Sequence, residues 1–204
     1  MIEPPEKPNR MVPTANASGK VALLGGSFNP PHCGHLRLCE AILAMPGIAG
    51  VWLVPVAVHP GRKPLAPFAD RLHMCRLMAA RVAGPVTVCD LEGRLEPPVK
   101  TRDLVRALVA LHPETPFVLA MGADVAAHAP RWPGWLDIVQ AAPPLIFPRF
   151  EPDFEPGFEP AVWASTEARR RLAAGEPASG LLLPEIEDYA TARRLYGPET
   201  HAEA

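Results

Sequence analysis

Two histidines three residues apart, His32 and His35, are the side chains in this sequence best suited to handling phosphate. They follow Gly25-Gly26-Ser27, which comes directly after an apolar run at residues 20–24. Glycines let a backbone turn sharply and approach a ligand closely, and the free N–H groups at a helix start attract anions. Imidazoles three apart at that start lie on one side of the helix. This arrangement can hold phosphate oxygens and stabilise the charge that develops during their transfer.

Other interpretations of the histidine pair explain less of the surrounding sequence. A strand–helix turn with two ordinary histidines would not require the glycines and Asn29-Pro30-Pro31 in register with Gly34. A zinc site is not favoured because a third ligand is not apparent. A P-loop is excluded because its closing Lys-Ser/Thr pair is absent.

The elements that must position these residues alternate between strand and helix. Thr101 is expected to cap one helix, whose side chains Leu104, Val105, Leu108 and Leu111 point inward. The alternation predicts an α/β fold: a single doubly wound, Rossmann-like parallel sheet with helices on both faces and ligands at the carboxyl ends of its strands. Strands are expected at residues 20–24, 51–54, 86–89, 117–121 and 145–147, and helices at 34–44, 70–82, 101–111, 135–141, 166–174 and 184–195.

The composition fits one domain of ordinary size. The chain has 204 residues and a formal net charge of -2, without a basic patch, so a nucleic-acid partner is not expected. We expect a disordered Pro-rich tail at residues 1–19, the domain at 20–197 and a flexible tail at 198–204. A Phe-Glu-Pro repeat at 150–160 is interpreted as an exposed acidic loop, with partner docking as the less favoured alternative.

The four cysteines lack the spacing of a zinc site or a disulfide framework, and no protein metal site is expected. No apolar run reaches membrane-spanning length and the N-terminus lacks a secretory core. The sequence therefore predicts a cytoplasmic protein with reduced thiols and no membrane partner. It leaves open whether the protein forms a homo-oligomer.

The segment Gly25-Gly26-Ser27-Phe28-Asn29-Pro30-Pro31-His32-Cys33-Gly34-His35 resembles the signature of the HxGH nucleotidyltransferases, and within them the nicotinate-mononucleotide adenylyltransferases. The resemblance covers nearly the whole chain after the first tail. Its further matches are Trp52-Leu53-Val54-Pro55, His59-Pro60-Gly61-Arg62-Lys63, Asp70-Arg71-Leu72-His73-Met74, Met121-Gly122-Ala123-Asp124, Trp132, Ala164-Ser165-Thr166-Glu167-Ala168-Arg169, Leu182-Leu183-Pro184 and Leu195-Tyr196.

The resemblance implies transfer of an adenylyl group from ATP to nicotinate mononucleotide, which gives deamido-NAD and pyrophosphate. It implies His32, His35 and Arg169 as catalytic residues, with Mg²⁺ carried on the ATP phosphates. The residues assigned to ATP are Gly25, Gly26, Ser27, Phe28, His32, His35, Gly122, Asp124, Ser165, Thr166 and Arg169, and those assigned to the mononucleotide are Asn29, Lys63, Lys100, Thr101 and Trp132.

Several of these assignments have a plain structural alternative. Ser165 and Thr166 could cap a helix, a role compatible with phosphate binding. Arg169 could be a solvated helix residue like the adjoining Arg170 and Arg171.

The same holds for three further residues and for the loop position of Asn29. Lys63 could be a solvated surface residue, Asp124 a helix cap and Trp132 a packing residue. Asn29 stands where many relatives have Asp, and either residue can brace the loop.

The sequence departs from the family pattern before the helix expected at 101–111. Relatives usually carry an aromatic-Thr pair there, whereas this chain has Pro98-Val99-Lys100-Thr101. The change concerns recognition of the nicotinate and leaves the adenylyl transfer intact, and Lys100 could pair with the nicotinate carboxylate. The "RPG" of the family is likewise replaced by Pro148-Arg149-Phe150.

Other acceptors and another class of function remain as alternatives. The same chemistry could act on nicotinamide mononucleotide or phosphopantetheine, although the doubled Gly25-Gly26 and the spacing from Asp124 to Trp132 favour the nicotinate branch. A divergent nucleotide-binding homologue with weak or no catalysis is the alternative that is not an active enzyme.

Overall fold

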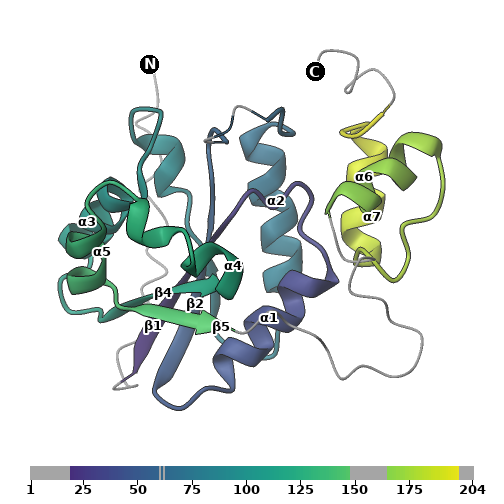
Figure 1. Cartoon of the computed structure of the whole chain (residues 1–204). Coiled ribbons are helices and arrows are strands. Elements are labelled where there is room, and N and C mark those ends of the chain that lie inside the picture. The colour runs from purple at the N-terminus through teal and green to yellow at the C-terminus, as the bar shows by residue number, and fades with distance from the viewer. Residues whose placement is uncertain (1–18, 60, 62, 148–164, 198–204) are drawn as a thin grey trace, which may run out of the picture.

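The computed structural model describes residues 19–59, 61, 63–147 and 165–197. Its centre is a parallel sheet of five strands in the order β3-β2-β1-β4-β5 (Figure 1). The chain builds β1, β2 and β3 outward in one direction and then crosses to the other side of β1. The strand order therefore reverses between β1 and β4, and sheets of this kind bind ligands at the carboxyl ends beside that point. The strands are β1 (Lys20–Gly26), β2 (Ile48–Pro55), β3 (Val86–Val88), β4 (Phe117–Gly122) and β5 (Pro144–Phe147).

Helices cover both faces of the sheet, which confirms the predicted doubly wound α/β fold (Figure 1). One face carries α1 (Cys33–Leu43) and α2 (Phe68–Ala79), with α7 (Pro184–Ala192) beside α2 and α6 (Ser165–Ala174) beside α7. The other face carries α3 (Thr101–Leu111), α4 (Ala123–Ala126) and α5 (Trp135–Ala141). Short 3₁₀ turns at Leu91–Arg94 and Ala129–Arg131 complete the described elements.

The apolar run of β1 serves two cores at once. Ala22 and Leu24 pack with α1 and α2, whereas Val21 and Leu23 pack with α3 and α5. Successive side chains of a strand point to opposite faces, so a strand covered on both faces is apolar at every position. This is why the run shows no polar alternation.

Two local expectations for α3 are wrong. The helix begins at Thr101, but its N-cap residue is Lys100 and no side chain caps it, so Thr101 does not cap this helix. Leu111 is 61% exposed and not inward: it is the last residue of the helix and does not join the core cluster that contains Leu104, Val105 and Leu108.

Several expectations fall on residues outside those described. These are the tails, apart from Gly19, the Phe-Glu-Pro repeat and Pro148-Arg149-Phe150. The limits of the domain at 20–197 therefore remain a prediction. Among the described helices, none has the length and apolar character required to cross a membrane.

Candidate active site

The phosphate-handling segment begins where β1 ends at the carboxyl edge of the sheet. Neither Gly25 nor Gly26 adopts a left-handed backbone, so the expected sharp turn at the glycines is wrong. The left-handed residue is Phe28, with φ of 46° and a ring that is 1% exposed. A Cβ at Gly26 would lie 3.2 Å from the Phe28 ring, a tight contact that favours glycine there. A Cβ at Gly25 would meet nothing within 4 Å, so β1 ends against open space that a ligand can fill.

The rings of the two histidines lie against each other at the start of α1, with their planes tilted by 35°. His32 is the N-cap residue and His35 lies in the first turn, with ring centroids 3.7 Å apart. The main-chain N–H of His32 donates to Nδ1 of His35 at 3.1 Å. A ring nitrogen that accepts a hydrogen bond carries no proton, so His35 carries its proton on Nε2. That N–H is the group His35 can offer to a phosphate oxygen.

Burial keeps both imidazoles neutral at pH 7. It lowers the pKa of His35 to about 4, and burial together with the neighbouring His35 lowers the pKa of His32 to about 2. The Nδ1 atom of His32 is buried and makes no hydrogen bond within the described part of the chain. Unsatisfied buried nitrogens are uncommon in folded proteins and often mark a functional position. The pair can therefore offer N–H donors to a ligand but carries no positive charge of its own.

The start of α1 is less free than expected. The N–H of Cys33, the first helical residue, donates to the carbonyl of Leu181 at 2.8 Å. The expectation that the N–H groups of this helix start are all available to a ligand is therefore wrong for Cys33. The contact ties α1 to the segment that precedes α7.

Helix α6 meets the loop between β1 and α1. The Ser165 hydroxyl donates to the carbonyl of Pro30 at 3.0 Å, and Arg169 Nη1 donates to the carbonyl of Asn29 at 2.7 Å. Arg169 Nη2 also donates to Thr166 Oγ1 at 3.3 Å. The structure thus brings residues from the two ends of the domain to one place, as a site approached from both halves requires.

The three consecutive arginines of α6 differ in their surroundings. Arg170 and Arg171 pair with Glu167 at 2.9 Å, in ion pairs typical of an exposed helix face. Arg169 is half-buried against the loop, and burial lowers the pKa of its guanidinium. Of the three, Arg169 is the one directed at the candidate site.

Asn29 braces this loop with its side chain. It is 4% exposed, and its Oδ1 accepts from the Ala66 N–H at 2.9 Å and from the Tyr196 hydroxyl at 3.1 Å. An oxygen engaged twice inside the protein is not available to a ligand. The Oδ1 atom of Asn29 thus braces the loop, and the assignment of this residue to mononucleotide contact stays a prediction.

A buried arginine that received no role from its sequence holds the surrounding loops together. Arg71 is 1% exposed and donates to three carbonyls: Ser27 at 2.8 Å, Ala66 at 2.9 Å and Ala57 at 3.2 Å. These carbonyls belong to the loop after β1 and to the two ends of the loop between β2 and α2. The signal in the sequence was an arginine among apolar residues of a helix, which alone does not distinguish a buried guanidinium from a solvated one.

Glu92 fixes the same region from the other side. It is 5% exposed, and its Oε1 accepts from the Ala57 N–H at 3.0 Å. Burial raises the pKa of Glu92 to about 7, although the Ala57 hydrogen bond and the charge of Arg71 oppose the shift. Ala57 is therefore held by Glu92 at its N–H and by Arg71 at its carbonyl.

Apart from Asn29, the residues assigned to the mononucleotide form no hydrogen bond or ion pair with this network among the described residues. Lys63 and Lys100 are exposed, and neither side chain makes a hydrogen bond within the described part of the chain. Lys100 and the half-buried Thr101 stand at the start of α3, which places them at the carboxyl edge because α3 runs antiparallel to the strands. Trp132 packs edge-on against Trp135, with ring centroids 6.1 Å apart. Its predicted stacking on a pyridine ring stays a prediction.

Gly122 and Asp124 lie at the end of β4. Gly122 is the N-cap residue of the short helix α4, and Asp124 is exposed in its first turn. The capping residue is thus Gly122, and the carboxylate of Asp124 is open to solvent beside the point where the strand order reverses.

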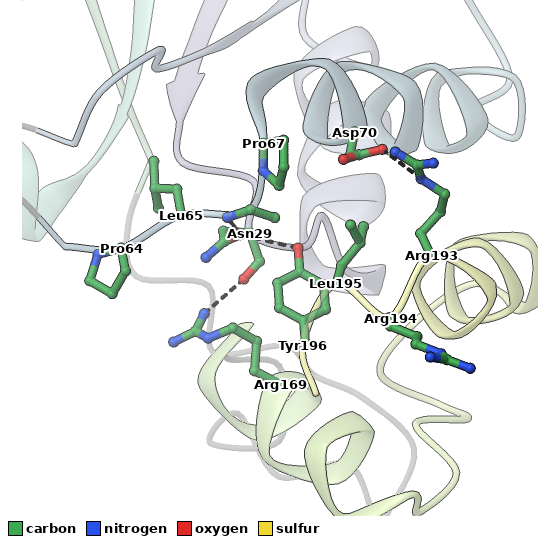
Figure 2. Close-up of a pocket in the computed structure, with 11 residues that line it drawn as sticks. Asn29, Pro64, Leu65, Pro67, Asp70, Arg169, Arg193, Arg194, Leu195 and Tyr196 are labelled. Atoms are coloured by element: carbon green, nitrogen blue, oxygen red, sulfur yellow. Dashed lines mark hydrogen bonds and ion pairs between the residues drawn. The ribbon is translucent and has the colours of Figure 1, made fainter. Parts of the chain in front are cut away.

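A cavity of about 310 Å³ lies between the loop after β1, the loop before α2 and the segment after α7 at residues 193–196 (Figure 2). Asn29 and Arg169 form part of its wall, with Leu65 on one side and Tyr196 on the other. Among the described residues, no group of three or more His, Cys, Asp or Glu side chains could hold a metal ion. Of the residues assigned to ATP, Arg169 lines this cavity, and its guanidinium suits phosphate oxygens.

Comparisons with known proteins agree with this geometry. The pattern of the cytidylyltransferase-like family matches residues 23–171. A protein named "Probable nicotinate-nucleotide adenylyltransferase" from Anaeromyxobacter dehalogenans strain 2CP-C is 44% identical over 87% of this chain and 96% of its own length. A protein of the same name from Myxococcus xanthus is 33% identical over 87% of this chain and 95% of its own length.

A solved structure shares the fold. Plasmodium falciparum nicotinic acid mononucleotide adenylyltransferase complexed with NaAD superposes with a TM-score of 0.69, covering 87% of this chain and 97% of that one. Its sequence is 20% identical, so this likeness supports the fold alone.

Proposed function

The chain belongs to the cytidylyltransferase-like family, and from that premise we propose that it transfers an adenylyl group from ATP to nicotinate mononucleotide, a step of NAD synthesis. The resemblance to nicotinate-mononucleotide adenylyltransferases is confirmed by the relatives of that name that span nearly the whole chain. The observation that carries the proposal is the loop between β1 and α1: the histidine pair stacks at its end, and Arg169 of α6 donates to the carbonyl of Asn29 within it.

The reaction needs no covalent intermediate on the protein. A phosphate oxygen of the mononucleotide forms a bond to the α-phosphorus of ATP while the bond to the bridging α–β oxygen breaks. The electron pair leaves with that oxygen, and pyrophosphate departs. The attacking phosphate is already ionised at pH 7, so no side chain has to remove a proton. Catalysis then consists of positioning and of stabilising charge.

The site residues divide this work between the phosphates. The neutral His35 donates from Nε2 to a phosphate oxygen of ATP, and His32 lies beside it. The pair thus contacts the phosphates through hydrogen bonds and without a positive charge. Arg169 holds the departing pyrophosphate, since a guanidinium offers several donors in one plane. Ser27 in the loop after β1, together with Ser165 and Thr166 at the start of α6, would complete the phosphate contacts.

We propose that Mg²⁺ enters on the ATP phosphates. Nucleotide-dependent transferases generally use a divalent metal, and Mg²⁺ commonly keeps its waters and binds substrate phosphates. The donor set of the site fits such a substrate-borne ion, because its histidines, hydroxyls and guanidinium bind phosphate oxygens and leave the metal to phosphate and water. When bound, the metal neutralises part of the phosphate charge.

We propose the exposed cations as contacts of the acceptor. Lys63 suits the phosphate of the mononucleotide, Lys100 suits the carboxylate of its nicotinate ring, and Thr101 and Trp132 are proposed as further contacts of the acceptor. Lys100 would distinguish nicotinate from nicotinamide, because the amide carries no charge.

We also propose the cytoplasm as the place of action. Cys33, Cys39, Cys75 and Cys89 are all free thiols, which a reducing compartment maintains.

Pyrophosphate release tests the function directly. Purified protein is incubated with ATP, Mg²⁺ and, in separate reactions, nicotinate mononucleotide, nicotinamide mononucleotide or phosphopantetheine. We expect release with nicotinate mononucleotide, and its complete loss in His35→Ala with the melting temperature retained. Release with another acceptor instead would reject the proposed acceptor. ATP binding without release for any acceptor would favour a nucleotide-binding homologue without catalysis.

A further inference from the structure

We propose that Tyr196 is a positioning residue for the side of the site that binds the β and γ phosphates, acting through Asn29 on Arg169. The proposal rests on the role of Arg169 in the proposed function. It gives a role to the described segment that follows α7, residues 193–197.

The Tyr196 hydroxyl is placed to act on the loop. The residue is 4% exposed, and its hydroxyl donates to Asn29 Oδ1 at 3.1 Å (Figure 2). Burial raises the pKa of the Tyr196 hydroxyl, so the group remains protonated and keeps donating across the ordinary pH range. The bond joins residues 167 positions apart in the sequence.

Asn29 passes this restraint to Arg169. Its Oδ1 is held by Tyr196 and by the Ala66 N–H, while its main-chain carbonyl accepts from Arg169 Nη1 at 2.7 Å. Figure 2 shows the side chains of Arg169 and Tyr196 both directed at Asn29. The acceptor of Arg169 is a main-chain carbonyl, so the orientation of the guanidinium depends on how firmly the backbone of Asn29 is held in place.

A fixed guanidinium binds phosphate better than a free one. Arginine has many rotamers, and holding one N–H on an immobile carbonyl removes part of the ordering cost when ligand arrives. The remaining N–H groups stay available beside the cavity that Asn29, Arg169 and Tyr196 line. Loss of the Tyr196 hydroxyl should therefore weaken the polyphosphate contact selectively and leave the fold and the other nucleotide contacts in place.

The test compares ATP with AMP, which lacks the β and γ phosphates. We expect calorimetric titration of Tyr196→Phe to show a Kd for ATP raised about three- to tenfold, the range for losing one hydrogen bond, with the Kd for AMP within about twofold of wild type. Tyr189→Phe is the matched control: it lies on α7, and its hydroxyl donates to Asp70 Oδ1 at 2.7 Å. The control should leave the ATP Kd unchanged.

A double variant checks the route. In an Arg169→Lys background, Tyr196→Phe should add less than about twofold to the ATP Kd, because the residue through which it acts is already altered. Full additivity would overturn the route through Arg169.

The outcomes separate this inference from the proposed function. Equal weakening of ATP and AMP, an effect matched by Tyr189→Phe, or no effect on ATP would each overturn the positioning role. ATP binding can be measured without an acceptor. If the protein binds ATP but does not turn over nicotinate mononucleotide, the proposed function is rejected, and the effect of Tyr196→Phe on ATP binding still tests the positioning role separately. A wild-type protein that does not bind ATP would overturn both.

Discussion

Replacing Arg71 by methionine should destabilise the protein and loosen two loops together, the loop after β1 and the loop between β2 and α2. Methionine keeps much of the buried aliphatic volume but removes the guanidinium, which donates to the carbonyls of Ser27, Ala57 and Ala66 at 2.8, 3.2 and 2.9 Å. Hydrogen bonds to charged groups contribute about 1.5–3 kcal/mol each, so three would total about 5–9 kcal/mol.

Two effects reduce that sum. Removing the guanidinium ends the cost of burying its charge, and the freed carbonyls lie on loops that can partly regain water. We therefore expect a loss of about 3–5 kcal/mol in the free energy of unfolding, the range seen when one partner is removed from a buried charged network. In a domain of this size that corresponds to a melting temperature lower by about 10 °C.

The assay is equilibrium unfolding in urea, with thermal melting as a second measurement. Arg76→Met is the matched control, because Arg76 lies on the same helix but is exposed, and it should change stability by less than about 0.5 kcal/mol. Arg71→Lys should recover only part of the loss, since one ammonium cannot reach three carbonyls in the plane of a guanidinium. A loss below about 1 kcal/mol in Arg71→Met would refute the view that this residue holds the loops.

Three further predictions follow from the surrounding charges. Burial raises the pKa of Glu92 to about 7 from 4.5, so the folded state loses stability as pH rises from 4.5 through 7. Glu92→Gln keeps an acceptor for the Ala57 N–H, and its free energy of unfolding should exceed that of wild type by about 1–3 kcal/mol at pH 8 and by little at pH 5. An equal gain at both pH values would contradict the pKa shift. Because the pKa of His35 is lowered in the folded state, the unfolded chain binds the additional proton below pH 6.5, and stability falls as pH drops from 6.5 toward 4. In urea unfolding, His35→Asn should reduce the slope of this fall by up to about 1.4 kcal/mol per pH unit. An unchanged slope would exclude a neutral buried His35. Lys100→Ala should raise the KM for nicotinate mononucleotide about tenfold, as expected for the loss of one charged contact, and leave the KM for nicotinamide mononucleotide unchanged. A KM for nicotinate mononucleotide that is the same in the variant and in wild type would reject the contact.

The fold could be predicted from the sequence because its signals are local. A strand covered on both faces is apolar at every position, as residues 21–24 are, and a helix shows its buried face every three or four residues, as Leu104, Val105 and Leu108 do. The histidine pair is local as well, since His32 and His35 meet within one helical turn. These periods specify which segments form strands and helices, and through them a parallel sheet with its ligand edge.

What the sequence left open depended on contacts between distant segments. Arg169, Arg170 and Arg171 are equivalent as letters, and only the packing of α6 against the loop after β1 directs Arg169 to Asn29, 140 residues away. Arg71 reaches Ser27 across 44 positions and Tyr196 reaches Asn29 across 167. A hydrogen bond of this kind leaves no period in the sequence, because its geometry is set by how whole elements pack. By itself, therefore, the sequence determined the sheet, its ligand edge and the histidine pair, whereas the tertiary structure decided which side chains hold the loop in place.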